Sequence, residues 1–76
     1  MATTARRVRI EYDAAGGFLH RWVSGTGRFW LAVPAGVTDA WVVEAAEAEA
    51  RRRAIRRIDH YNATVSDVRI IAGGGA

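Results

Sequence analysis

The residues best suited to catalysis are few in this chain of 76 residues, and they lie far apart. His20 and His60 are the only histidines, and histidine is the side chain that ordinarily titrates near neutral pH. Ser24 and Ser66 flank predicted turns, and neither has a histidine and a carboxylate at a spacing that would activate its hydroxyl as a nucleophile. We therefore expect no catalytic residues and no enzymatic activity.

A metal or cofactor site is not expected either. The chain has no cysteine, which excludes disulfides and thiolate metal sites. No cluster of carboxylates accompanies either histidine. The glycines of segments 25–27 and 73–75 do not follow a strand and open a helix with a lysine, as phosphate-binding loops do. The sequence therefore predicts neither a metal nor a cofactor.

A different chemistry is indicated by aromatic and arginine side chains in two short apolar segments, 18–24 and 28–33. Trp22 and Trp30 stand on either side of SGTG, residues 24–27, which is typical of a hairpin turn. Flat rings and guanidinium groups anchor protein interfaces. The same groups bind single-stranded nucleic acids, because bases stack on the rings and arginines contact phosphates. Composition alone does not choose between these partners.

The elements that must position these residues begin with three predicted strands. Residues 6–12 alternate polar and apolar side chains with the period of two that is typical of a half-buried strand. Segments 18–24 and 28–33 are the second and third predicted strands, joined by turns at 13–17 and 25–27. Pro34 ends the third strand, and the three together form an antiparallel meander.

One long helix is expected next, from about Asp39 to about Tyr61, with Thr38 as its N-cap. Its apolar stripe comprises Val43, Ala46, Ala50, Ala54, Ile58 and Tyr61. A last strand over residues 64–71 completes the order β-β-β-α-β. The sequence thus predicts a two-layer α+β fold, an antiparallel sheet with one long helix packed on one face. This single small domain spans 1–76, and we expect residues 1–5 and 73–76 to be disordered.

Alternation along the strands divides the sheet into two faces, and two assignments are open. In the first, the helix covers an aliphatic-rich set that comprises Val8, Ile10, Tyr12, Leu19, Val23, Phe29, Leu31, Val33, Val68 and Ile70. Trp22 and Trp30 then form a cross-strand pair on the other face. In the second, the tryptophans lie beneath the helix. We favour the first, because it gives the core branched aliphatic residues and leaves the arginines in water.

Under either assignment the second and third strands are apolar on both faces, whereas one helix covers only one face. The remaining apolar surface is therefore expected to contact a partner. The predicted partner-binding residues are Arg9, Phe18, His20, Trp22, Arg28, Trp30 and Arg69. A third possibility is that the two tryptophans only shield each other, with arginines stacked over them.

The helix carries the charged run EAAEAEARRRAIRR over residues 44–57. Glu47 precedes Arg51 and Glu49 precedes Arg53 by four positions, and each such pair stabilises a helix by about 0.2–0.5 kcal/mol. This pattern is typical of a solvated, salt-bridged helix face. A surplus of arginines remains, and the possible nucleic-acid-binding residues are Arg52, Arg53, Arg56 and Arg57.

Charge and composition set the remaining limits. All basic residues other than histidine are arginines, and the net charge is +3, which permits nucleic-acid binding without requiring it. The absence of lysine, with abundant alanine, glycine and valine, indicates a GC-rich bacterial or phage genome. No apolar run approaches the ~20 residues that cross a membrane, and the N-terminus does not have the pattern of a signal peptide. We expect a cytoplasmic protein with no membrane partner.

Together these features predict a small, non-enzymatic protein-binding module, a regulator or an inhibitor, that forms a homo-oligomer through the aromatic and arginine face. The alternative is a nucleic-acid-binding regulatory protein that uses the same face or the arginine-rich helix end. The two hypotheses differ in their response to salt, because phosphate binding weakens steeply as salt rises and a hydrophobic interface does not.

Overall fold

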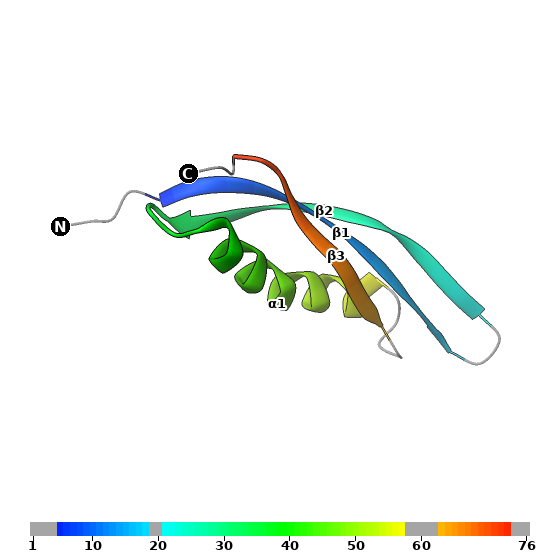
Figure 1. The fold of residues 1–76 in the computed structure, drawn as a ribbon. Helices are drawn as coiled ribbons and strands as arrows, with labels where there is room; N and C mark the ends of the chain where they lie inside the picture. Colours follow the sequence, from blue (N-terminus) through cyan, green and yellow to red (C-terminus); the bar gives the residue numbers. More distant parts are fainter. Residues whose placement is uncertain (1–4, 19–20, 58–62, 74–76) are drawn as a thin grey trace.

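The computed structural model describes residues 5–18, 21–57 and 63–73. The elements are β1 (Ala5–Phe18), β2 (Arg21–Pro34), α1 (Asp39–Arg57) and β3 (Thr64–Ala72). The strands form one sheet in the order β2-β1-β3, and both neighbouring pairs are antiparallel. Helix α1 lies against one face of this sheet (Figure 1). The predicted α+β class, with an antiparallel sheet and a single helix on it, is confirmed.

The prediction of a separate third strand before the helix is wrong. Segments 18–24 and 28–33 belong to the single strand β2, and β1 continues through the predicted turn at 13–17. The two strands pair without a shift from Ala5 opposite Pro34 to Phe18 opposite Arg21. The glycines of the SGTG segment do not adopt the positive φ of a tight turn, because each is held extended by a partner on β1.

Gly27 has a specific place in this long hairpin. It lies directly opposite Tyr12, and a Cβ at Gly27 would come closer than 3.0 Å to the tyrosine ring. The ring of Tyr12 therefore occupies the space above the glycine. It also packs beside Phe29, with ring centroids 5.8 Å apart and planes tilted by 57°.

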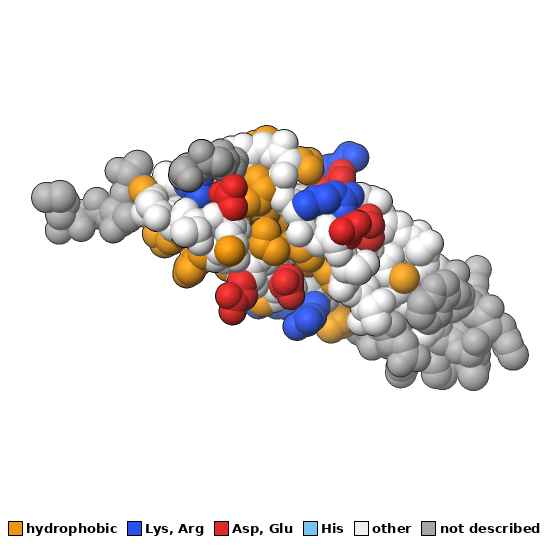
Figure 2. Space-filling model, viewed as in Figure 1, with side chains coloured by type: hydrophobic (Ala, Val, Ile, Leu, Met, Phe, Trp, Pro, Cys, Tyr) orange, Lys and Arg blue, Asp and Glu red, His pale blue; other side chains and the backbone are white. Residues whose placement is uncertain are grey.

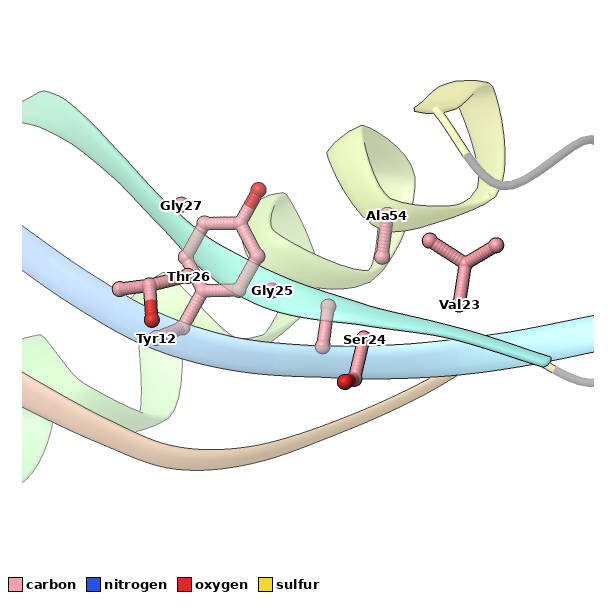
Figure 3. A pocket seen from close by; sticks show the side chains of 8 residues that line it. Tyr12, Val23, Ser24, Gly25, Thr26, Gly27 and Ala54 are labelled. Atoms are coloured by element: carbon pink, nitrogen blue, oxygen red, sulfur yellow. The ribbon is translucent and has the colours of Figure 1, made fainter.

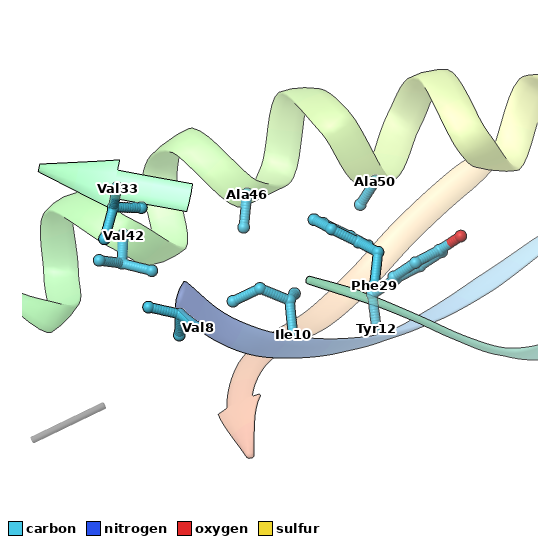
Figure 4. Packing of buried hydrophobic residues seen from close by; sticks show 8 residues of the cluster. All are labelled: Val8, Ile10, Tyr12, Phe29, Val33, Val42, Ala46 and Ala50. Atoms are coloured by element: carbon cyan, nitrogen blue, oxygen red, sulfur yellow. The ribbon is translucent and has the colours of Figure 1, made fainter. Parts of the chain in front are cut away.

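The core lies between the sheet and the helix (Figure 4). Its buried members are Val8, Ile10, Tyr12, Phe29, Val33, Val42, Ala46 and Ala50. Leu31, Val68 and Ile70 pack against this cluster while partly buried. The first assignment of sheet faces is thereby confirmed for these residues. Val23 also lies on the helix face, where it lines a hollow with Tyr12 and Ala54, but it is 55% exposed. Leu19 lies outside the described residues.

The helix stripe is confirmed at Ala46, Ala50 and Ala54, which are buried. Val42 rather than Val43 is the fully buried valine of the first turn, and Val43 is half-buried. The small alanine side chains let the backbone of α1 lie close to the sheet. The expected continuation of the helix through Ile58 and Tyr61 lies outside the described residues.

Thr38 caps the helix as predicted. Its Oγ1 accepts a hydrogen bond from the backbone N–H of Trp41 at 3.2 Å, and its carbonyl oxygen accepts one from Val42 at 3.0 Å. The first bond satisfies a donor that has no partner within the first turn of the helix, and the second is the first backbone bond of the helix itself. The cap therefore sets the point at which the chain leaves β2 and enters α1.

Arg6 ties the start of β1 to two other segments. Its Nη2 donates to the carbonyl oxygen of Val37 at 3.0 Å, and its Nη1 donates to that of Gly73 at 3.3 Å. Gly73 has φ of 77°, so this position favours glycine. Ala5 begins β1 and Gly73 follows the end of β3, and disorder at the two ends of the chain stays a prediction. Residues 1–4 and 74–76 lie outside the described part of the chain.

The hairpin is longer than the helix that covers it (Figure 1). A strand of 14 residues is about 46 Å long, and a helix of 19 residues is about 28 Å long. The ends of β1 and β2 nearest residues 19–20 therefore extend beyond α1. Within the described ranges, no helix has the length and apolar character needed to span a membrane.

Candidate interaction surface

The sheet face opposite α1, called the outer face below, carries a tryptophan flanked by two arginines. Trp30 of β2 lies opposite Arg9 of β1 and is 47% exposed. The guanidinium carbons of Arg7 and Arg9 each lie 5.3 Å from the centroid of the Trp30 ring. Both arginines alternate along β1 with the buried Val8, so they reach the same ring from the same face. The separations are those of cation–π interactions.

Beside this group, Glu11 holds one arginine from each neighbouring strand. Arg28 of β2 donates from Nε to Oε2 of Glu11 at 2.6 Å. Arg69 of β3 donates from Nε to Oε1 at 3.0 Å and from Nη2 to the same oxygen. The hydrogen bonds from Arg28 and Arg69 hold the pKa of the Glu11 carboxyl below its ordinary value, and the bond to Glu11 raises the pKa of Arg69. The ionised triad joins all three strands.

The charges on this face are unevenly compensated. Asp13 lies 3.6 Å from Nη2 of Arg69 and accepts a hydrogen bond from Oγ1 of Thr26 at 3.2 Å. Arg7 and Arg9, in contrast, make no ion pair with any described residue. The uncompensated positive charge of the outer face is therefore concentrated around the indole of Trp30.

Four of the predicted partner-binding residues meet on the outer face: Arg9, Arg28, Trp30 and Arg69. Arg28 and Arg69 bind Glu11, which the prediction did not include among the site residues. The alternation of Arg7, Arg9 and Glu11 in the sequence indicates that Glu11 lies on this face. The register with β2 then places Arg28 opposite Glu11. His20 and the side chains of Phe18 and Trp22 lie outside the described part of the chain.

The predicted cross-strand pair of Trp22 and Trp30 is wrong. Both residues belong to β2, where eight positions separate them by about 26 Å. The backbone partner of Trp22 on β1 is Gly17, whereas that of Trp30 is Arg9. The indole of Trp30 is thus flanked by arginines and not by a second indole.

The arginines of the helix form a separate group. Glu49 accepts hydrogen bonds from Nε of Arg53 at 2.8 Å and from Arg52, and these bonds lower the pKa of the Glu49 carboxyl. The predicted pair of Glu49 and Arg53 is confirmed. The other predicted pair, Glu47 with Arg51, does not form among the described ion pairs.

Two of the four candidate nucleic-acid-binding arginines, Arg52 and Arg53, are therefore bound to one carboxylate. The guanidinium of Arg53 also lies 4.7 Å from the ring centroid of Phe29. Arg56 is exposed, and the side chain of Arg57 is not among those described. The helix thus offers less free positive charge than its sequence indicates.

A hollow lies between the hairpin and the end of the helix (Figure 3). It has a volume of about 130 Å³, and its walls include Tyr12, Val23, Gly27 and Ala54. The described residues of its lining include no carboxylate, histidine or arginine. No group of three potential metal ligands occurs within the described residues.

The core approaches solvent beside β3. Figure 2 shows apolar side chains in a band across the middle of the molecule, with acidic and arginine side chains on either side. Val65, Val68 and Ile70 of β3 pack against the core while remaining half-buried. The charged residues thus border the apolar surface, and none of them is buried in it.

Comparison with known protein families finds no matching model, and no curated protein or solved structure matches the chain. The function must therefore be argued from the chemistry of this chain's own side chains.

Proposed function

We propose that this chain is a small, non-enzymatic protein-binding module, a regulator or an inhibitor, and that its contact surface is the outer face around Trp30. One observation carries the proposal. A half-exposed indole lies between two arginines that have no carboxylate partner among the described residues, on the sheet face that the helix leaves uncovered. Tryptophan and arginine are the residue types most enriched among the anchors of protein interfaces.

The charges around Trp30 favour a protein over a nucleic acid. Glu11 and Asp13 stand on the same face and neutralise Arg28 and Arg69. Nucleic acids repel carboxylates, and their binding depends on many uncompensated cations along the phosphate backbone. A tryptophan anchor bordered by ion pairs resembles instead the apolar centre and polar rim of a protein interface.

A nucleic-acid-binding regulator remains the second candidate because of one observation. Arg7 and Arg9 keep their full charge beside a flat ring, which is a combination that binds phosphates and stacked bases. Under this hypothesis, oligonucleotides bind the chain and the affinity falls steeply as the salt concentration rises. Substitution of both arginines by alanine would then reduce the salt dependence as well as the affinity.

Site-specific photo-crosslinking in the cell that makes the protein tests the proposal. A photoreactive side chain replaces Ala32, which is exposed on β2 opposite Arg7. The matched control replaces Ala48, which is exposed on α1. We expect a discrete protein adduct from position 32 that is absent from position 48 and is lost in Trp30→Ala. Equal adducts from both positions, or no protein adduct, would contradict the proposal, and a nucleic-acid adduct at position 32 would favour the alternative.

A further inference from the structure

The two edges of the sheet, which are separate from the outer face, differ in length and regularity. At one edge, β2 is extended over 14 residues and pairs with β1 without a single register shift. At the other edge, β3 has nine residues and its pairing with β1 shifts twice. Asp67 within β3 has φ of 57°, which a residue other than glycine rarely adopts. The β3 edge is short and irregular, whereas the β2 edge is long and regular.

Edge strands expose unpaired N–H and C=O groups that can accept another strand. Proteins block such pairing with bulges, short strands and charged side chains. The β3 edge has all three, because Asp67 and Arg69 add charge to its bulges. Among the described side chains of β2, only Arg28 is charged, and Glu11 of the same copy neutralises it. Within its described side chains, the β2 edge therefore has none of these protections.

We infer that a second copy of this chain pairs along β2, antiparallel to the first, to form a continuous six-stranded sheet. A two-fold axis brings the same strand of each copy to the interface, so one contact covers both unprotected edges. The edges that remain are those of β3, whose bulges oppose further pairing. The asymmetry of the sheet thus specifies a closed dimer and not a growing fibre.

Charge does not oppose this contact, since the Arg28 residues of the two copies each carry a bound carboxylate at 2.6 Å. Pairing of the two strands supplies a little over half of the area that a stable dimer needs. A strand about 46 Å long whose side chains span about 10 Å covers roughly 460 Å² per copy when paired along its length. Stable interfaces cover about 800 Å² per partner.

Exposed apolar side chains on β2 supply further area. Val23 is 55% exposed and Trp30 is 47% exposed, and the two lie on opposite faces of the strand. In an antiparallel pair, both gain cross-strand neighbours from the second copy. The dimer therefore also places the two Trp30 side chains on one face of one enlarged sheet.

Two matched double substitutions test the inference. Ser24 and Thr26 are exposed on β2, and Ser66 and Thr64 are exposed on β3. Ser24 and Thr64 flank the same residue of β1, Ala15, and the other two flank Asp13. Ser24→Lys with Thr26→Lys, and Thr64→Lys with Ser66→Lys, thus add equal charge to the same face at equal distances from β1, but at opposite edges.

The measurement is the solution mass by light scattering over a wide range of protein concentrations. We expect a dimer for the unsubstituted chain and for the β3 variant. In the β2 variant, like charges along the shared edge raise the dissociation constant about tenfold or more. Far-UV circular dichroism of both variants checks that the fold is kept.

A monomeric unsubstituted chain overturns the inference. A dimer that survives both double substitutions, or one that dissociates equally with either, also overturns it, because neither result depends on the β2 edge. The two proposals can be scored separately. Ser24→Lys with Thr26→Lys weakens the dimer but leaves Trp30 and its two arginines in place, so loss of the dimer with the crosslinked partner retained separates the β2 contact from the outer face.

Discussion

Arg9 lies directly opposite Trp30 in the β1–β2 pairing, and its guanidinium carbon is 5.3 Å from the centroid of the indole ring. Arg7, two positions earlier on the same face, lies at the same distance. An indole held in this way is neither buried in the core nor freely exposed. Its contribution to stability is therefore small, while its contribution to recognition can be large.

The first prediction concerns the stability of the Trp30→Ala variant. A cation–π interaction at an exposed site contributes about 0.5–1 kcal/mol, so the loss of two lowers the free energy of unfolding by about 1–2 kcal/mol. Phe29→Ala, one position away on the core face, should lower it by about 3–5 kcal/mol. Urea denaturation of both variants gives the comparison. Equal losses would mean that Trp30 is a core residue.

A second prediction uses two glycines of β2 that differ in their surroundings. Gly27→Ala places a Cβ against the ring of Tyr12 and should lower the free energy of unfolding by about 1–3 kcal/mol, as overpacking does. Gly25→Ala meets no atom within 4 Å, so the loss of chain entropy in the unfolded state should raise stability by about 0.4–1 kcal/mol. Thermal denaturation separates the two. A stabilised Gly27→Ala variant would show that the tyrosine ring moves aside freely.

These glycines also show why the sequence predicts the faces of the sheet better than the number of its strands. The alternation of Val8 and Ile10 with Arg7 and Arg9 is a local pattern, and it correctly assigns the core. The glycines of the SGTG segment have local preferences for a turn, but pairing with β1 along its whole length keeps them extended. This pairing depends on the register between segments that are distant in the sequence. The residue pattern of one segment does not reveal that register.

The same reasoning explains what could be predicted of the candidate site. Arg9, Arg28, Trp30 and Arg69 lie on the predicted face because their parity in the strands is local information. The bonds that Arg28 and Arg69 form with Glu11 depend on the strand order β2-β1-β3, which places β1 in the centre. The sequence indicates no such order, so it predicts the members of the site and not their partners.

A third prediction concerns the helix cap. Thr38→Ala removes the acceptor of the Trp41 N–H and should lower the free energy of unfolding by about 1 kcal/mol. Thr38→Ser keeps an oxygen in the same place and should lose much less. Urea denaturation followed by circular dichroism measures both variants. If Thr38→Ser loses as much as Thr38→Ala, the threonine methyl group and not the hydrogen bond is what stabilises the helix start.

The last prediction is a dependence of stability on pH that arises at Glu11. The bonds from Arg28 and Arg69 lower its pKa in the folded chain from the ordinary value of 4.5. A group whose pKa falls on folding stabilises the fold above its unfolded pKa, and this stabilisation is lost as the pH falls through the folded pKa. Stability should therefore decline below about pH 4.5, where the unfolded chain takes up the proton first.

Glu11→Gln isolates this contribution, because the amide keeps the shape of the side chain and cannot ionise. At neutral pH the variant should be less stable than the unsubstituted chain. The difference should shrink as the pH falls below 4.5 and through the lowered pKa of Glu11 in the folded chain, because the carboxylate then takes up a proton and loses its charge. Glu49→Gln serves as the comparison, because the bonds from Arg52 and Arg53 lower the pKa of Glu49 on the helix. Urea denaturation at a series of pH values measures all three chains. A constant difference between Glu11→Gln and the unsubstituted chain would show that the triad on the outer face acts through shape and not through charge.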